Sequence, residues 1–136
     1  MNLIKELTRN DTGETGSNQE GITIPKVTKL LKYFPLLDSN IKNPRTEVNF
    51  LDDDNKIWTF GFVYYNNKFF SGTRNEYRLS KTKAYLKKNN LKAKDKIIFY
   101  LNKNNVRMIS YEKKKNNIYN KDNVIVLSGK WYEGKI

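Results

Sequence analysis

Two short polar segments hold the residue types best suited to contacts with a nucleic acid. The first runs from Arg9 to Gly21 and the second from Gly72 to Arg78. Each sets hydrogen-bonding side chains in a frame rich in glycine and threonine. Arginine matches the paired acceptors of guanine, asparagine or glutamine the donor–acceptor pair of adenine, and glutamate or aspartate the amino group of cytosine. The two segments therefore predict contacts with base edges in a duplex rather than catalysis.

The candidate DNA-binding residues fall in these segments, with one lysine just beyond the second. They are Arg9, Asn10, Asp11, Thr12, Thr15, Asn18 and Gln19 in the first, and Arg74, Asn75, Glu76, Tyr77, Arg78 and the following Lys81 in the second. Alternate side chains of a strand share a face. Arg74, Glu76 and Arg78 are therefore expected on one face, with Asn75 and Tyr77 on the other. The alternative is a surface Arg–Glu–Arg ion network, which contributes little stability.

Composition supports a polyanionic partner. Lysine and arginine outnumber aspartate and glutamate by 26 to 14, which gives a formal net charge of +12 over 136 residues. An excess of this size favours nucleic-acid binding. The length predicts one domain, residues 1–136, with a single modest core. Lysines outside the two segments (Lys83, Lys87, Lys88 and Lys113–Lys115) are either phosphate contacts or solvated surface.

Several kinds of site are excluded by the residue types. The chain has no cysteine and no histidine, so disulfides, thiol nucleophiles, structural zinc sites and histidine catalysis are ruled out. No apolar run is long enough to span a membrane. The expectation is a soluble, cytoplasmic protein that needs no cofactor and no metal. Asp52–Asp54 is expected to form an acidic turn, and the Glu112-Lys113-Lys114 sequence is a weak nuclease signal without a further acid.

The elements that must position the two segments are mostly short strands. Strands are expected at 3–8, 22–24, 46–51, 57–65, 73–78, 96–101, 106–111 and 124–127. Alternating Trp58, Phe60, Phe62 and Tyr64 are expected in the core rather than as stacking platforms for bases. Helical spacing is present from Val27 to Phe34, and a second helix is expected after Ser80. Residues 10–21 are expected to form a surface loop. This pattern favours an open β-barrel of about seven strands with two short flanking α-helices.

The order of these motifs resembles a known family. The Trp58-x-Phe60-x-Phe62-x-Tyr64 strand, the Thr73–Leu79 segment, the helix with Tyr85-Leu86 and the Lys94–Phe99 stretch resemble the plant B-three DNA-binding pseudobarrel. Asn10-Asp11-Thr12-Gly13-x-Thr15-Gly16, with Gln19, Gly21 and Ile24-Pro25, is similar to the N-terminal, effector-binding domain of EcoRII-type restriction endonucleases. Asn18 and Thr23 stand where that family has His and Tyr, and Tyr77 replaces a basic residue. These departures leave the target sequence open.

The resemblance implies a function for the two segments. In that family they are recognition arms that enter the major groove from either side, which places the first arm at about residues 9–21 and the second at about 71–79. Two arms in one groove cover about half a helical turn, or roughly five to six base pairs. The expected partner is double-stranded DNA with a short specific site, with catalysis left to a separate nuclease domain or subunit. The alternatives are an OB-like single-strand binder, a compact metal-dependent nuclease and a protein-interaction module.

Overall fold

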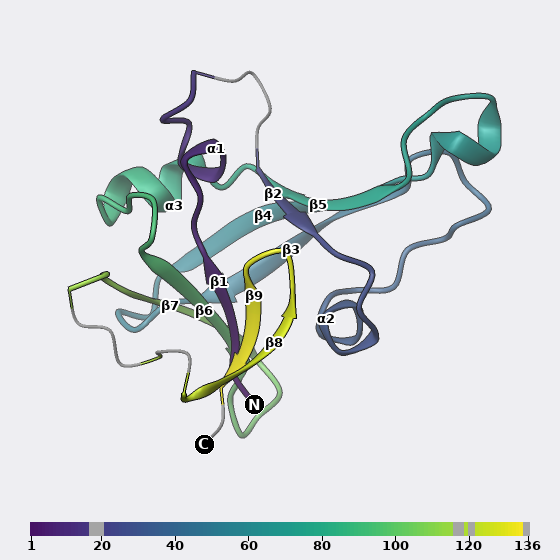
Figure 1. The fold of residues 1–136 in the computed structure, drawn as a ribbon. Helices are drawn as coiled ribbons and strands as arrows, with labels where there is room; N and C mark the ends of the chain where they lie inside the picture. The colour runs from purple at the N-terminus through teal and green to yellow at the C-terminus, as the bar shows by residue number, and fades with distance from the viewer. Residues whose placement is uncertain (17–20, 116–118, 120–121, 135–136) are drawn as a thin grey trace.

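A single curled sheet forms the framework of the chain (Figure 1). The computed structural model describes residues 1–16, 21–115, 119 and 122–134. The strands are β1 (Leu3–Glu6), β2 (Ile22–Ile24), β3 (Arg45–Leu51), β4 (Ile57–Tyr65), β5 (Glu76–Ser80), β6 (Lys96–Leu101), β7 (Arg107–Glu112), β8 (Val124–Ser128) and β9 (Trp131–Gly134). The helices are α1 (Arg9–Thr12), α2 (Thr28–Tyr33), the 3-10 helix η1 (Asn67–Phe70) and α3 (Lys83–Lys88).

The nine strands are ordered β2-β5-β4-β3-β7-β6-β1-β9-β8. Neighbours are antiparallel except β3 and β7, which meet in parallel at the single pair Leu51 and Met108. β1 lies between β6 and β9, so the first strand of the chain closes onto its last one. This curled open sheet confirms the expected mainly-β pseudobarrel.

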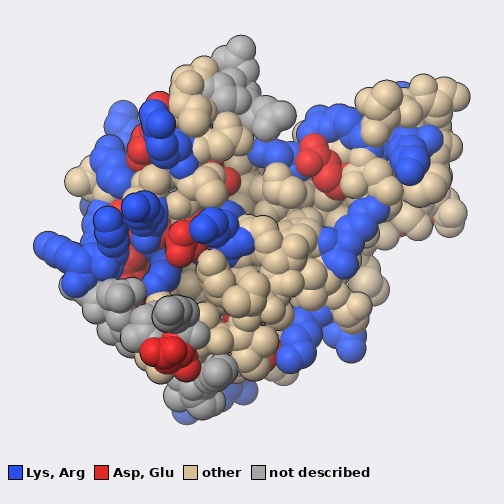
Figure 2. All heavy atoms as spheres, viewed as in Figure 1, with Lys and Arg blue, Asp and Glu red and all other residues tan. Residues whose placement is uncertain are grey.

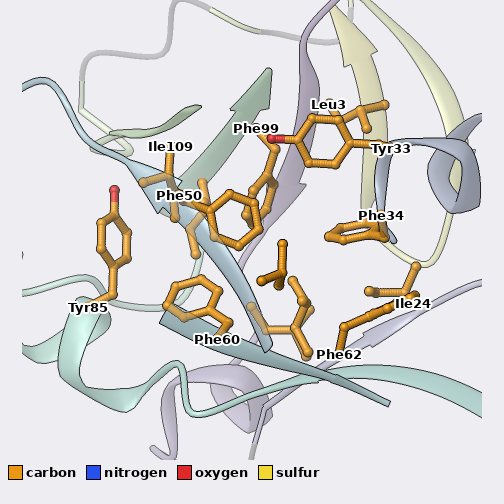
Figure 3. Close-up of a cluster of buried hydrophobic side chains, with 14 of the residues drawn as sticks. Leu3, Ile24, Tyr33, Phe34, Phe50, Phe60, Phe62, Tyr85, Phe99 and Ile109 are labelled. Atoms are coloured by element: carbon orange, nitrogen blue, oxygen red, sulfur yellow. The ribbon is translucent and has the colours of Figure 1, made fainter. Parts of the chain in front are cut away.

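Aromatic side chains fill the inside of the curl (Figure 3). Phe50, Phe60, Phe62 and Phe99 are almost fully buried, and α2 adds Tyr33 and its following residue Phe34. Phe34 stacks on Phe62 with ring centroids 5.0 Å apart. The expectation that Trp58, Phe60, Phe62 and Tyr64 are core residues is confirmed, since each is buried. Offset and edge-to-face ring pairs stabilise such a core beyond the effect of burial alone.

Several element boundaries differ from the sequence-based expectations. Residues 67–70 form a 3-10 helix that the sequence patterns did not predict, and the last stretch adds a strand, β9, that the alternation did not reveal. Ser80 ends β5 instead of capping α3, whose N-cap is Thr82 and whose buried residues are Tyr85 and Leu86. The hairpin partner β8 and the neighbour β1 give residues 131–134 their strand conformation, which is a long-range effect.

Candidate nucleic-acid interface

The two predicted arms project from the same side of the sheet (Figure 1). The first arm leaves the end of β1 through α1, and the second extends from the ends of β4 and β5 with η1 at its far end. A notch separates the two projections in the space-filling view (Figure 2), and lysine and arginine side chains lie at its base and along the right-hand projection. The polar segments singled out from the sequence therefore flank one hollowed face.

The second arm splits into two faces at its strand, as expected from alternation. Tyr77 stacks on Tyr64 with centroids 4.2 Å apart and on Phe62 at 5.7 Å, so its side chain lies toward the core. This burial raises the pKa of Tyr77, and the neighbouring Tyr64 hydroxyl adds to the effect. Glu76 and Arg78 lie on the opposite face, because neighbouring side chains of a strand alternate. The outward face of β5 is thus polar and charged, while its inner face is packed.

Arg74 is held in a fixed orientation just before β5. Its guanidinium lies over the ring of Tyr65, 3.7 Å from the ring centroid, and its Nε donates to Glu76 Oε1 at 3.1 Å. The Nη2 group donates to the same oxygen. An arginine has five N–H donors in a planar fork, and these contacts leave the Nη1 group without a partner among the described residues. Arg74 therefore presents the end of its fork, with the side chain 41% exposed.

Arg78 lies in a different environment from Arg74. Its side chain is 7% exposed, and Nη1 donates to Thr23 Oγ1 at 2.7 Å. Nη2 donates to the carbonyl oxygen of Gly21 at 3.2 Å, and Glu76 Oε2 lies 3.9 Å from Nη1. Arg78 thus ties β5 to the segment entering β2, next to Glu76. The predicted direct base contact of Arg78 stays a prediction.

Asn75 lies beside the core-facing side of the second arm. Its Oδ1 accepts a hydrogen bond from the Tyr64 hydroxyl at 2.7 Å and another from Lys26 Nζ. Both contacts hold the arm against the end of β4 and the segment after β2. Lys81 follows β5 as an exposed residue with a positive φ of 61°. DNA contacts by Asn75, Tyr77 and Lys81 also stay predictions.

The first arm begins with a helical turn instead of the expected loop. Thr8 Oγ1 accepts from the Asp11 N–H, and the Asp11 carboxylate accepts from the Thr8 N–H at 2.9 Å. This capping box stabilises the turn, and Gly13 ends it with φ 81°. Asp11 also pairs with Lys5 at 3.1 Å, and both side chains are buried. Burial lowers the pKa of Lys5 and the Asp11 charge opposes that shift. Asp11 thus anchors the base of the arm.

The other first-arm candidates lie nearer the surface. Arg9 is exposed, and its carbonyl accepts from the Thr12 hydroxyl at 3.2 Å. The Thr15 hydroxyl donates to Asn10 Oδ1 at 3.3 Å. Asn18 and Gln19 lie outside the described residues. Glu14 binds the Ala93 N–H at 3.0 Å, which lowers the pKa of its carboxyl group and fastens the arm to the loop after α3.

A hollow of about 480 Å³ separates the first arm from α3. The arm contributes Asn10–Gly13 and Gly16, while α3 and its loop contribute Lys83, Lys87 and Lys92. A second hollow shares Lys92 and is lined further by Lys113, Lys114 and Lys115. Of these lysines, only Lys113 pairs with an acidic group of the described residues, Asp95 at 3.4 Å. Figure 2 shows the resulting gathering of basic side chains around α3, which attracts phosphate groups.

Sequence reasoning did not assign a structural role in the second arm to three residues, although Thr23 was noted as a departure from the family pattern. Tyr65 supports Arg74, Thr23 fixes Arg78, and the Asn67 side chain accepts from the Arg74 N–H at 2.6 Å. Gly21, by contrast, was already part of the first polar segment identified from the sequence. Its φ is 95°, and a Cβ there would come within 2.0 Å of the Leu79 carbonyl oxygen. A glycine is therefore required where β2 meets β5.

No metal-binding or membrane-spanning element is evident in the part of the chain that is described. Among those residues, no group of three or more Asp, Glu, His or Cys side chains is placed to hold a metal ion. None of their helices has the length and apolar character needed to span a membrane. Asp52 accepts from the Trp58 indole N–H at 2.8 Å and from the backbone N–H groups of Asp54 and Lys56. The acidic turn expected at 52–54 is therefore organised by its own hydrogen bonds.

Comparison with known proteins identifies both the fold and the family. The chain is similar in structure to an Arabidopsis FUS3–DNA complex, with a TM-score of 0.62 and 24% sequence identity over 81% of this chain and 94% of that chain. The fold is thus that of the plant B-three pseudobarrel. A search of curated proteins found no match. The family model described as "Restriction endonuclease EcoRII, N-terminal" matches residues 1–96, which include both arms. The chain therefore belongs to the EcoRII N-terminal domain family.

Proposed function

We propose that residues 1–136 act as one sequence-specific double-stranded DNA-binding domain, which grips the major groove between the first and second arms. The observation that carries this proposal is the Arg74–Glu76 pair. Tyr65 and Glu76 hold the Arg74 guanidinium, and the Arg74 side chain is still 41% exposed. Two parallel donors from an arginine match guanine O6 and N7. The paired Glu76 carboxylate supplies an acceptor for the amino group of a cytosine.

Charge and family membership support the same proposal. The net charge of +12 gives a strong attraction to phosphates, which positions a protein on DNA without reading its sequence. The similar FUS3 structure is a complex with DNA. The family name supports a role as the recognition part of a restriction endonuclease, with strand cleavage carried out by a separate domain or subunit. We place the protein on DNA in a prokaryotic cytoplasm.

The buried aromatic strand favours duplex binding over single-strand binding. A single-strand binder stacks bases on accessible aromatic rings. Trp58, Phe60, Phe62 and Tyr64 are each at most 8% exposed, so none offers an open ring face of that kind.

The test is selection from a randomised duplex library at about 0.15 M salt, where non-specific binding is weakened. One short motif of roughly five to six base pairs is expected in the bound pool. A bound pool without enrichment would overturn sequence-specific binding. Displacement of the duplex by poly-dT would instead indicate a single-strand binder, and magnesium-dependent cleavage of a plasmid would indicate a nuclease.

A further inference from the structure

Two aromatic side chains are exposed at the far end of the second arm. We call residues 67–73 the tip; it contains η1 and lies at the end of the projection from β4 and β5 (Figure 1). Phe69 is 67% exposed and Phe70 is 39% exposed. Transfer of such apolar surface from water to a binding partner is favourable.

The tip is fixed by hydrogen bonds to Asn67. The Gly72 N–H donates to the Asn67 carbonyl at 2.6 Å, and the Arg74 N–H donates to the Asn67 side chain at 2.6 Å. Ser71 has a positive φ of 69°, and a Cβ at Gly72 would lie 2.5 Å from Asn67 Oδ1. The aromatic rings are therefore carried by a closed turn. Binding by a preorganised group loses less conformational entropy than binding by a flexible one.

The tip is joined directly by a backbone hydrogen bond to Arg74, the residue of the second arm proposed to contact a base. The Lys68 N–H donates to the Arg74 carbonyl at 2.9 Å, so Phe69 follows the residue paired with Arg74. Consecutive residues are about 3.8 Å apart, and consecutive bases of one strand are about 3.4 Å apart along the helix. The backbone at Phe69 is therefore close to the residue proposed to contact a base edge, at a spacing comparable to that of neighbouring bases.

The groove itself identifies what an apolar side chain can contact. The base edges in the major groove present hydrogen-bond donors, acceptors and one apolar group, the C5-methyl of thymine. 5-Methylcytosine carries a methyl group at the same ring position. We propose that Phe69 contacts the C5-methyl group of a pyrimidine next to the base pair contacted by Arg74. The second arm then distinguishes a pyrimidine with a C5-methyl group from one without it. This inference rests on the proposed DNA binding.

The experiment removes the methyl group and the aromatic ring separately. The probe is the duplex recovered by selection, in which each thymine is replaced in turn by deoxyuridine and each cytosine in turn by 5-methyldeoxycytidine. Affinities are measured for the native protein, Phe69→Ala and Phe69→Leu. Val126→Ala is the matched control, because Val126 is 71% exposed on β8, outside both arms.

The expected result is a methyl effect at one position that depends on Phe69. Burial of one methyl-sized group corresponds to about fourfold in affinity. If the methyl group belongs to thymine, its replacement by deoxyuridine should weaken binding of the native protein by about that factor. If it belongs to 5-methylcytosine, replacement of one cytosine by 5-methyldeoxycytidine should instead strengthen binding. Phe69→Ala should bind both forms equally, Phe69→Leu should keep part of the difference, and Val126→Ala should match the native protein.

Two outcomes would overturn the contact while leaving the proposed function intact. One is native binding that is indifferent to every methyl replacement, and the other is a methyl effect that Phe69→Ala retains. A third result would assign the tip to a protein contact. In that case the native protein would show no methyl effect, and deletion of the tip would abolish association with a nuclease subunit. A library that yields no motif would overturn the proposed function itself, and this inference with it.

Discussion

Arg74 and Arg78 belong to one sequence motif, yet the structure predicts that loss of Arg74 affects DNA binding and loss of Arg78 affects the stability of the fold. Replacement of each by alanine separates a residue that contacts DNA from one that holds the arm. Arg74→Ala should reduce affinity at the specific site with little change in stability. Arg78→Ala should reduce stability first, because its guanidinium is buried between β5 and the entry to β2.

The loss of stability expected for Arg78→Ala follows from the hydrogen bonds of its guanidinium group. The substitution removes a hydrogen bond to Thr23 at 2.7 Å and another to the Gly21 carbonyl at 3.2 Å, and it leaves Glu76 without its second cation. A hydrogen bond from a charged donor contributes about 1.5–3 kcal/mol, and such values do not add fully. The free energy of unfolding should therefore fall by about 2–4 kcal/mol.

Loss of Arg74 should weaken DNA binding rather than lower the free energy of unfolding. Its side chain is 41% exposed, and an exposed ion pair contributes about 0–1 kcal/mol to stability. A bidentate contact to guanine contributes about 1–3 kcal/mol of discrimination, which is about 5-fold to 150-fold in affinity. That reduction should be confined to the specific site.

Two assays measure these effects. Urea unfolding gives the free energy of unfolding, and competition binding gives the affinity for a specific and an unrelated duplex. Equal weakening on both duplexes for Arg74→Ala would make Arg74 a phosphate contact. Native stability of Arg78→Ala would refute the inference drawn from its burial.

Three further predictions concern the buried Lys5–Asp11 ion pair, the lysines of α3 and the carboxyl group of Asp95. Asp11→Asn should lower the free energy of unfolding by about 3 kcal/mol, because it leaves the Lys5 charge buried without its partner; Asp54→Asn on the exposed turn is the control in urea unfolding. Lys83→Gln with Lys87→Gln should reduce the salt slope of DNA binding by about 0.9 for each phosphate that the protein no longer neutralises. Lys103→Gln, in the β6–β7 turn away from the arms (Figure 1), should leave that slope unchanged, and an unchanged slope in the double variant would exclude phosphate binding there. The pKa of Asp95 is lowered, since hydrogen bonds from Lys92, Lys114 and Lys113 outweigh the opposing effect of burial. Its stabilising effect is present above its unfolded pKa of about 4 and is lost as pH falls through the folded pKa. Asp95→Asn should therefore flatten the acid-induced loss of stability below about pH 4; an unaltered pH profile would contradict this.

The sequence by itself determined the class of fold and singled out the two polar segments of the proposed interface. Alternation from Trp58 to Tyr64 identifies a half-buried strand, and the spacing from Val27 to Phe34 identifies α2, because both patterns depend on local periodicity. The two polar segments were visible because glycine, threonine and paired charges are rare inside a core. Local patterns of this kind also placed Arg74 and Glu76 together.

Only the tertiary structure decided what each polar residue does. Asp11 and Arg78 are of the types that contact bases, yet one is buried against Lys5 and the other against Thr23 and Gly21. Tyr65 and Asn67 gave no signal as supports for Arg74, and residues 131–134 became a strand only by joining β1 and β8. The physical reason is the same throughout. A hydrogen-bonding side chain takes its role from the partners that distant strands bring to it, and sequence spacing does not specify those partners.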